Sequence, residues 1–584
     1  MYYDFLVKIP ENTGKITVNR RVDTTYIEYT YDRKYIPEKK YNVPKRTTIG
    51  KQSKADLTMM QPNQNFVKFF PEIPLPDERN NSNRSSCLRI GAYLVIRKII
   101  EEYNLPKILS NYWDERGVGL FLDLAAYSII CENNAGQYYP DYAYNHPLLT
   151  ENMKIYSDST VSRFMDSISG DDKVGFLNSW NATRNHRERI YISYDSTNKN
   201  CQAGDIEMVE FGHPKDDKGT PVFNYSVAYD TYNKEPLFYE TYPGSIVDVS
   251  QLQFMLEKAK GYGYKKVGFI LDRGYFSKKN IQYMDSCHYD FVIMVKGMAS
   301  FVEKIILNNK GSFEKKRACL IPEYQVYGMT FQDKLYADDE KDRYFHIYHK
   351  VTKESAERGI LEGKIRKMTE FLKKHEGKSI NLGEIYHWYF DIFSHEKDNG
   401  TNKFLYAKEK IEVIERELEL CGYFVIVTSR KMTAAEALSL YKSRDASEKL
   451  FRGDKSYLGN KSLRVYGNES ANAKIFIEFV ALVVRCKIYT QLKAMMAEMS
   501  KKPNYMTVPA ALKELEKIEM IRQLDNVYRL DHAITATQKT ILKSFGVDEK
   551  YIKEKAMMLS QQLKVAKISG RDEENDRYEE DDID

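Results

Sequence analysis

Cysteine is scarce in this chain, and its few copies are scattered. Seven cysteines occur in 584 residues, and no two of them form a Cys-x-x-Cys pair. An odd number of isolated thiols is typical of a reducing compartment and argues against both a disulfide framework and a zinc cluster. The cysteines therefore predict a cytoplasmic protein with reduced thiols.

Long hydrophobic runs are also missing. The start of the chain, MYYDFLVKIPENTG, has no apolar core followed by a small-residue cleavage site, so we expect no signal peptide. The most apolar stretch, GVGLFLDLAAYSIICE, contains Asp123 and is too short to cross a bilayer, which favours a buried helix. The composition is that of a folded, soluble chain of several domains, with no membrane partner.

Strong charge of one sign is confined to the C-terminus. The chain has a formal net charge of +5, but its last 14 residues, RDEENDRYEEDDID, hold nine acidic residues against two arginines. Residues 1–570 are therefore distinctly basic, which suits a polyanionic partner. We expect the tail to be disordered and to compete for the same surface. Solubility alone is the alternative explanation of both features.

The first 185 residues divide into a strand-rich part and a helical part. KITVNRRV and TTYIEYTYD predict short strands, and a basic loop follows, RKYIPEKKYNVPKRTTIGKQSK, in which prolines prevent a helix. Its cations and tyrosines suit a phosphate backbone and base stacking. After the polar linker DERNNSNRSS the helical period dominates. Within it, SDSTVSRFMDSI predicts a capped helix, which we expect to pack against its neighbours, although a helix-turn-helix that reads DNA is the alternative.

From residue 189 strands and helices alternate. RIYISYDST predicts an apolar strand that ends at Asp195, FNYSVAYDTYNKEPLFYETYPG a hairpin that turns at residues 231–234, and KKVGFILDRGYFS a strand that ends at Asp272. With the intervening helices, this order predicts an α/β fold with a mixed sheet. Residues 298–418 interrupt the pattern, and a segment of about 120 residues is too long for a loop, so it predicts an inserted domain. CGYFVIVTS then resumes the pattern.

The helix predicted after CGYFVIVTS carries four functional side chains in one line: Tyr441, Arg444, Glu448 and Lys455. At about 100° per residue they lie within about 60° of one helix face. The structural explanation is a solvated face with an ion pair between Arg444 and Glu448. Gly453 weakens the case for one unbroken helix as far as Lys455.

Three carboxylates give this line a second explanation. Asp195 and Asp272 stand where apolar strands are expected to end, which is where ligand sites of α/β sheets gather. Together with Glu448 they would form an all-oxygen cluster, the ligand set that Mg²⁺ and Mn²⁺ prefer. A single aspartate after a strand is more often a turn or N-cap residue, so only the three carboxylates together support a metal site.

Taken in order, YISYDST, FILDRGYFS, GYFVIVTS and Tyr441-x2-Arg444-x3-Glu448-x6-Lys455 resemble the DDE transposases of bacterial insertion sequences. The spacing of the last four residues is similar to the signature of the insertion-sequence-four group, and a long insertion before the glutamate is typical of that group. The resemblance is strongest over residues 189–297 and 419–490. It is looser over the N-terminal KKYNVPKRTTIGK and the C-terminal LDHAITATQKTILKSFG.

The resemblance implies an RNase H-like catalytic core, a mixed sheet flanked by helices and interrupted by a large insertion domain. In such an enzyme Asp195, Asp272 and Glu448 are catalytic and hold two Mg²⁺ ions, for which Mn²⁺ can substitute. The enzyme cleaves the terminal inverted repeats of its own element and joins the 3′-hydroxyls to target DNA, as a homodimer in a synaptic complex at the nucleoid. The residues expected to contact DNA are Tyr441, Arg444, Lys455, Arg273 and Trp388.

A hairpin intermediate is a further expectation. Group members with this insertion stack an extruded base on an aromatic residue, and Trp388 lies in the aromatic run IYHWYFDIF. The alternative is that this run forms the core of the insertion. For the whole chain, the alternatives are a transposase-derived regulator without cleavage activity and a stand-alone structure-specific nuclease.

These observations predict a division of the chain into seven parts. They are a strand-rich DNA-binding region (1–90), a helical domain for DNA ends (91–185), the first half of the core (186–297), the insertion domain (298–418), the second half of the core (419–500), a C-terminal helical region (501–570) and the acidic tail (571–584).

Overall fold

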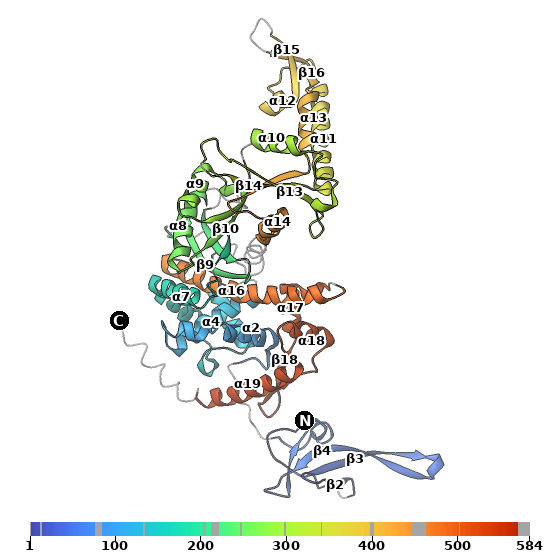
Figure 1. Ribbon diagram of the computed structural model, residues 1–584. Coiled ribbons are helices and arrows are strands. Elements are labelled where there is room, and N and C mark those ends of the chain that lie inside the picture. The colour runs from blue at the N-terminus through green and yellow to red at the C-terminus, as the bar shows by residue number, and fades with distance from the viewer. Residues whose placement is uncertain are drawn as a thin grey trace. The chain divides into compact units, whose positions relative to one another are not determined.

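The structure is a computed structural model (Figure 1), and its chain divides into two compact units. The first unit comprises the described residues up to Lys173 and from Val465 onward, and the second comprises those from Val174 to Asp445 with residues 463–464. No described helix is both long and apolar enough to cross a membrane. The structure describes residues 2–11, 14–75, 84–131, 135–187, 189–201, 206–211, 221–245, 248–296, 299–339, 341–396, 402–445, 463–501 and 503–569.

A five-stranded antiparallel sheet opens the first unit. Its order is β1-β5-β4-β3-β2, and α1 (Gln64–Phe69) packs on it through a core that contains Ile27, Ile49 and Phe66. The strands are β1 (Val7–Lys8), β2 (Ile16–Arg20), β3 (Thr25–Ile36), β4 (Tyr41–Gln52) and β5 (Met59–Pro62).

The basic loop expected over residues 33–54 is mostly a β-hairpin, so that expectation was wrong. Strands β3 and β4 pair along their whole length, and the chain turns between them in the 3-10 helix Pro37–Lys39. The prolines do exclude an α-helix, but Pro37 fits the turn and Pro44 is accommodated in β4. Cross-strand pairing therefore overrides the local preference for a loop.

The remainder of the first unit is mainly helical. Its longest helix, α16 (Asn468–Glu498), is the buried helix expected from ANAKIFIEFVALVVRCKIY, and it packs on α4 (Glu115–Ile130) and α6 (Asp158–Ser167). Ser157 caps α6, as expected, by accepting the Thr160 amide at 3.2 Å. The other elements are α2 (Gly91–Glu102), α3 (Leu105–Leu109), α5 (Tyr139–Asn145), α17 (Val508–Leu515), α18 (Ala536–Lys543), α19 (Glu549–Ser569) and a sheet of β6 (Cys87–Arg89), β18 (Glu519–Arg522) and β19 (Tyr528–Leu530).

A nine-stranded mixed sheet organises the second unit. Its order is β12-β13-β14-β17-β11-β10-β7-β8-β9, and β10 is parallel to both β7 and β11, whereas all other neighbours are antiparallel. The mixed sheet and the expected hairpin are therefore confirmed. The strands are β7 (Ile190–Asn200), β8 (Val222–Asp230), β9 (Glu235–Pro243), β10 (Val267–Leu271), β11 (Asp290–Met294), β12 (Leu320–Ile321), β13 (Val326–Asp333), β14 (Arg343–His349) and β17 (Tyr423–Thr428).

Helices flank this sheet. The Trp180 indole of α7 (Gly170–Ala182) is buried and donates to the Pro236 carbonyl at 3.0 Å, which fixes α7 against β9. The expected helices after the hairpin and after Asp272 are present as α8 (Asp248–Gly261) and α9 (Lys278–Ser286). Two more helices, α10 (Ala299–Asn309) and α14 (Ala434–Ser443), also contact strands of this sheet.

Residues 298–418, expected to be one inserted domain, contain two kinds of structure. Strands β12, β13 and β14 extend the main sheet, because β14 pairs with β17 over six residues. A second part has a core of its own, built around Leu361, Ile365, Phe390 and Phe404. Its elements are α11 (Val351–Lys374), α12 (Glu384–Tyr389), β15 (Phe390–Glu396), β16 (Asn402–Glu409) and α13 (Ile411–Leu420).

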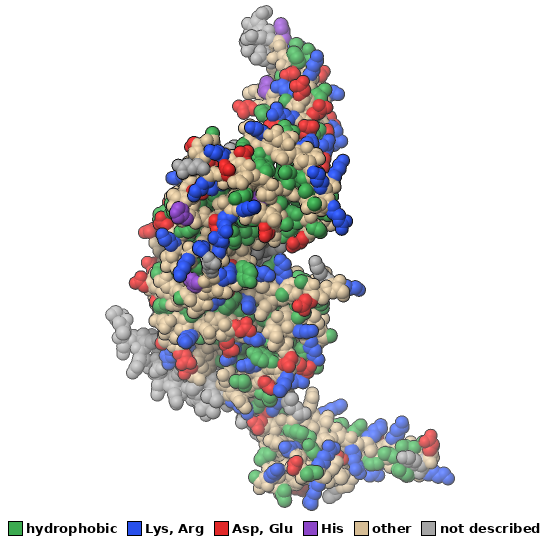
Figure 2. Space-filling view, viewed as in Figure 1, with side chains coloured by type: hydrophobic (Ala, Val, Ile, Leu, Met, Phe, Trp, Pro, Cys, Tyr) green, Lys and Arg blue, Asp and Glu red, His purple; other side chains and the backbone are tan. Residues whose placement is uncertain are grey.

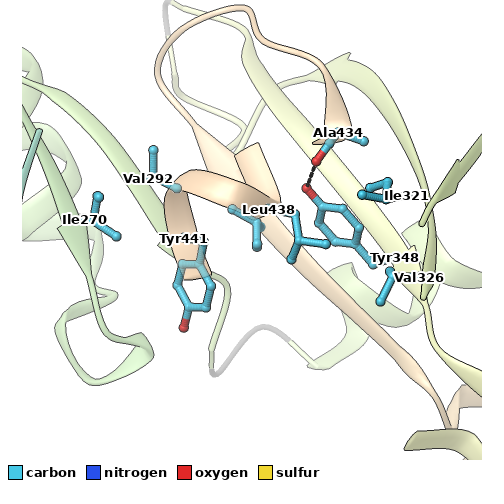
Figure 3. Packing of buried hydrophobic residues seen from close by; sticks show 9 residues of the cluster. Ile270, Val292, Ile321, Val326, Tyr348, Ala434, Leu438 and Tyr441 are labelled. Atoms are coloured by element: carbon cyan, nitrogen blue, oxygen red, sulfur yellow. Dashed lines mark hydrogen bonds between the residues drawn. The ribbon is translucent and has the colours of Figure 1, made fainter. Parts of the chain in front are cut away.

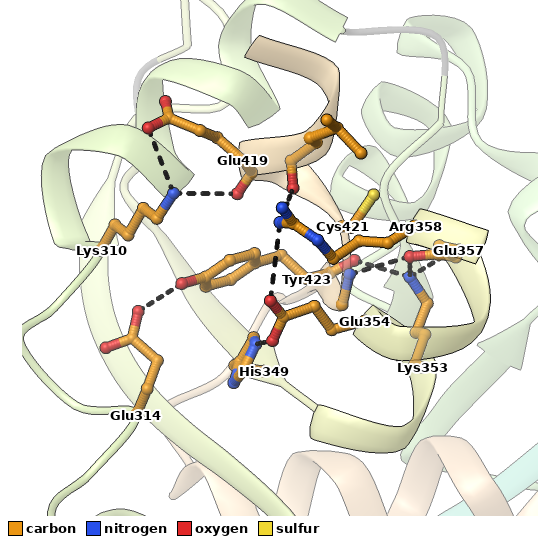
Figure 4. A network of polar contacts seen from close by, with 12 residues as sticks. Lys310, Glu314, His349, Lys353, Glu354, Glu357, Arg358, Glu419, Cys421 and Tyr423 are labelled. Carbon is orange, nitrogen blue, oxygen red and sulfur yellow. Dashed lines mark hydrogen bonds and ion pairs between the residues drawn. The ribbon is translucent and has the colours of Figure 1, made fainter. Parts of the chain in front are cut away.

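A network of polar contacts joins this second part to the sheet (Figure 4). The Glu357 carboxylate of α11 accepts the Gly422 amide at 2.8 Å and Lys353 Nζ at 2.7 Å, and Lys353 also donates to the Tyr423 carbonyl at 3.0 Å. The Tyr423 hydroxyl donates to Glu314. The two places where the chain leaves and rejoins the sheet are thus held together.

Candidate active site

Asp195 lies in β7, and Asp272 directly follows β10, the neighbouring parallel strand of the mixed sheet. Tyr194 of β7 is the register partner of Leu271 of β10, and the two aspartates are the residues that follow. Neighbouring strands are about 4.8 Å apart, so the backbones of the two residues lie at the same level of the sheet. The expected juxtaposition of these positions is therefore present in the backbone; the side chain of Asp195 lies outside the described part.

The expectation that the first strand ends at Asp195 was wrong. Strand β7 continues to Asn200, because β8 pairs with it antiparallel as far as Val222. It is β10 that stops at Leu271, so Asp195 stands beside the carboxyl end of its neighbour. The polar sequence STNKN gives no local strand signal, and only the ladder with β8 makes it a strand.

The carboxylate of Asp272 is not used to cap the turn that follows it. Asp272 precedes the 3-10 turn Arg273–Tyr275 with extended backbone angles, and its side chain makes no capping hydrogen bond. The side chain is 38% exposed and faces Arg444, whose NH1 lies 3.5 Å from Oδ1. The N-cap explanation of this aspartate is therefore not what the structure shows.

Arg444 reaches Asp272 from the C-terminal end of α14, whose N-terminal end is fixed by two sets of contacts. A capping box of Thr433 and Glu436 begins the helix, and the Tyr348 hydroxyl donates to the Ala434 carbonyl at 2.7 Å (Figure 3). Arg444 follows as the C-cap residue, and its side chain is only 12% exposed. A guanidinium so held has lost much of its freedom before any ligand arrives.

Tyr441 belongs to the core beneath this site (Figure 3). Its side chain is 5% exposed and packs with Ile270, Val292 and Leu438, and the Arg444 guanidinium lies 5.5 Å from its ring centroid. The ring is therefore used for packing and for supporting Arg444, and it is not available for stacking on a base in this structure. The hydroxyl points away from Leu438.

The four-residue line on one helix face is only partly described. Helix α14 ends at Ser443, so the line is helical at Tyr441 and reaches Arg444 at the cap. Glu448 and Lys455 lie outside the described residues. The ion pair expected between Arg444 and Glu448 is thus not described, whereas the pair of Arg444 with Asp272 is.

One contact at this site had no counterpart in the expectations. The Tyr275 hydroxyl donates to Ser196 Oγ at 3.2 Å, and the Tyr275 ring lies 5.2 Å from that of Tyr194. These residues flank the two aspartates in sequence, so the contact ties β7 to the turn after β10. The only sequence feature that could have pointed to this contact is the position of Tyr275, three residues after Asp272.

The two other residues expected to contact DNA are exposed. Arg273 follows Asp272 directly and is exposed. Trp388 of α12 is 59% exposed, and its Nε1 donates to Glu417 at 2.8 Å. Within the aromatic run the core explanation holds for Tyr389 and Phe390, which are buried, and not for Trp388.

The described residues contain no group of three or more His, Cys, Asp or Glu that could hold a metal ion. Of the three expected ligands, only Asp272 has a described side chain. Its accessible carboxylate is a hard oxygen donor of the kind that Mg²⁺ binds.

The structure is that of an α/β protein in which the backbones of Asp195 and Asp272 share one level of the mixed sheet. Residues 191–484, half of the chain, match the transposase DDE domain family, and the chain belongs to this family of DNA-cleaving and strand-transferring enzymes. A comparison with curated proteins found no match. Among solved structures, the chain is similar to a piggyBac transposase synaptic complex with hairpin DNA, studied by cryo-EM, at 8% identity and a TM-score of 0.35 over 80% of this chain and 82% of that one. A TM-score of this size does not establish a shared fold.

Proposed function

We propose that this chain is the transposase of an insertion sequence of the insertion-sequence-four type. It would bind the terminal inverted repeats of its own element, cleave them and join the 3′-hydroxyls to target DNA. The observation that carries this proposal is the shared level of Asp195 and Asp272 on parallel strands, with Arg444 held at Asp272, inside the segment that matches the family.

We assign β7–β11 to an RNase H-like core. Strands β9, β8 and β7 are antiparallel, and β10 and β11 continue the sheet parallel to β7. In chain order, Asp195 lies on the first of these strands and Asp272 directly follows the fourth. The part from α11 to α13 is then an insertion between the last core strand and the glutamate. The basic N-terminal sheet and the helical regions on either side of the core would serve DNA binding.

Asp195, Asp272 and Glu448 would hold two Mg²⁺ ions, and Mn²⁺ could substitute. Bound ions of this kind activate an attacking hydroxyl and stabilise the leaving oxygen of a phosphodiester. Two observations support magnesium at this site. All three residues offer carboxylate oxygens, which Mg²⁺ prefers, and the Asp272 carboxylate is accessible and does not cap the turn that follows it.

The cations around the carboxylates would position DNA. Arg444 presents a planar guanidinium that can bind two oxygens of one phosphate, and Arg273 and Lys455 would bind phosphates next to it. The Tyr441 ring would act indirectly by holding Arg444 in place.

Hairpin formation and dimerisation are the finer parts of this proposal. A hairpin requires an extruded base, and an aromatic surface lowers the unstacking cost of a few kcal/mol. Trp388 offers such a surface because more than half of it is exposed. A homodimer would hold two element ends in one synaptic complex.

Cleavage of DNA that carries the flanking inverted repeats, with Mg²⁺ present, tests the proposal. Asp195→Ala, Asp272→Ala and Glu448→Ala should each abolish cleavage and leave binding of the ends largely intact, because the metals serve chemistry more than affinity. Asp333→Ala is the matched control, since this exposed carboxylate ends another strand of the same sheet. Near-normal cleavage by one of the three variants would remove that residue from the site.

The same assay separates the alternatives. A regulator would bind the ends and cleave nothing, and a structure-specific nuclease would cleave without preference for the ends.

A further inference from the structure

The hairpin of β3 and β4 extends beyond its own sheet (Figure 1). Strand β2 pairs with β3 only over Thr25–Tyr29, and β5 pairs with β4 only over Gly50–Gln52. From Thr30 and Arg46 outward the hairpin is two-stranded, about 20 Å long at 3.3 Å per residue. None of its side chains described over residues 31–46 is buried. We call this segment, residues 31–46, the ribbon.

A bare ribbon of this kind is a poor structure in water. An isolated two-stranded hairpin is at best marginally stable, because both faces are solvated and no core forms. Tyr31, Tyr35 and Tyr41 are nevertheless 46%, 55% and 54% exposed on it. A partner that covers the ribbon would bury these rings and satisfy its backbone edges.

The positive charge of the N-terminal region is concentrated on this hairpin. Residues 31–52 contain seven Lys and Arg against two acidic residues, whereas the rest of residues 2–75 contains six of each sign. Figure 2 shows Lys and Arg side chains along the hairpin. Because the rest of the region is balanced in charge, solubility does not explain the excess of cations on the hairpin. We therefore expect the partner of the ribbon to be an anion.

The two faces of the ribbon differ in chemistry. Cross-strand partners share a face and successive residues alternate. The pairs Arg33 with Pro44 and Tyr35 with Asn42 therefore define one face, which Arg46 joins two residues beyond Pro44 along β4. This Arg–Asn face carries no acidic residue.

The opposite face is partly neutralised. It carries Lys34, Tyr41 and Lys45, and the Lys45 ammonium is paired with Asp32 at 2.6 Å. Phosphate could still bind Lys34 there, but this Lys face lacks the planar donor groups that recognise bases. Arginine binds guanine O6 and N7 with two hydrogen bonds, and asparagine binds adenine N6 and N7 in the same way.

We propose that the ribbon enters the major groove of the DNA bound by this chain, with the Arg–Asn face toward the base edges. The major groove is about 12 Å wide and admits a two-stranded ribbon. Arg33, Asn42 and Arg46 read bases, and Tyr35 contacts the sugar-phosphate wall. The inference rests on the proposed function, because it takes duplex DNA as the partner, and it assigns sequence reading to a surface separate from the carboxylates.

Selection from a pool of random duplex DNA by the full-length protein, followed by sequencing, tests this inference. The wild type should enrich a motif. Arg33→Ala, Asn42→Ala and Arg46→Ala should each lose preference at one or two positions of that motif by about 5- to 150-fold. Replacement of guanine by 7-deazaguanine at a position lost in Arg33→Ala should weaken the wild type and leave the variant unaffected, since only the major-groove N7 is removed.

Lys34→Ala is the matched control, because it removes one charge from the next residue on the other face. It should weaken binding to all sequences alike and retain the motif. All four side chains are exposed, and circular dichroism of each variant checks that the fold is kept.

Three results would overturn the inference: an unchanged motif in the three Arg–Asn face variants, an equal change in Lys34→Ala, or tighter binding of the wild type to RNA or single strands than to duplex. Cleavage with Mg²⁺, measured on the same samples, keeps the two proposals distinguishable. Normal cleavage with an unchanged motif refutes only the reading role. A motif that depends on the Arg–Asn face, without any cleavage, refutes only the enzymatic proposal.

Discussion

His346 lies in β14, between β13 and β17, and α14 contacts all three of these strands. It is fully buried in β14, with Nδ1 2.8 Å from Thr330 Oγ1 of β13 and Nε2 3.0 Å from Thr428 Oγ1 of β17. The Thr428 hydroxyl donates to the Arg430 carbonyl, so it accepts a hydrogen bond from Nε2–H. The ring therefore has a proton on Nε2, and burial favours the neutral form, in which Nδ1 accepts from Thr330.

Burial lowers the pKa of His346 from its usual value near 6.5 to about 4. Between these two values the unfolded chain binds a proton that the folded protein excludes, so folding is progressively disfavoured as the pH falls from about 6.5 to 4. At 1.36 kcal/mol for each unit, the loss reaches about 3 kcal/mol at pH 4. Above pH 6.5 the contribution of His346 to stability is complete and constant.

Hydrogen exchange of peptides from β14 and β17 measures this loss locally, which suits a chain of two units, for which a single unfolding transition is not expected. After correction for intrinsic exchange rates, the opening free energy of the wild type should fall from pH 7.5 to 4.5 relative to His346→Gln by about 2–3 kcal/mol. The exposed His395→Gln should follow the wild type. A difference between wild type and His346→Gln that stays constant over this range would refute a neutral, buried His346.

Four other substitutions test the site and its supports. Arg444→Ala and Lys455→Ala should each reduce the salt dependence of DNA binding by about one unit of slope, and an unchanged slope in both would remove them from the DNA surface. Trp388→Ala should still nick the DNA end but stall at hairpin formation while it remains folded, and hairpins formed at the normal rate would end that role. Gly422→Ala should lower the melting temperature by an amount equivalent to about 1–3 kcal/mol. The φ of Gly422 is +89°, and a Cβ there would lie 2.6 Å from the Cβ of Glu354. An unchanged melting temperature would show that the backbone at Gly422 and the start of α11 can shift to accept the methyl group.

The core strands could be predicted because their signals are local. VGFIL and YFVIVT are short apolar runs bounded by polar or turn residues, and both are strands of the sheet. The turn at residues 231–234 was read correctly, since it separates two strand-like runs by four residues. The sequence also led us to expect the two aspartates close together, although the reason was only half right, because Asp195 lies within β7 and only β10 ends at this level.

What could not be predicted depends on partners that are distant in sequence. Strand β14 contains an alternating pattern, RYFHIYH, but its place beside β17 depends on a segment about 75 residues away, so the sequence suggested an insertion. Residues 196–200 and 41–52 are strands only because β8 and β3 supply the ladder. The ion pair of Arg444 with Asp272 likewise joins residues that are 172 positions apart in the chain.

The pairing of Arg444 with Asp272 connects the cations of the site to its carboxylates. Carboxylates brought to one edge of a sheet repel one another, and a nearby cation offsets that repulsion. In the described part of the site Arg444 performs this role for Asp272. If Arg444 binds DNA as proposed, phosphate and the Asp272 carboxylate would compete for one guanidinium, and a cation that neutralises the carboxylate would leave Arg444 to the phosphate. The salt slope of Arg444→Ala should consequently differ from that of the wild type more when a divalent cation is present than when it is chelated.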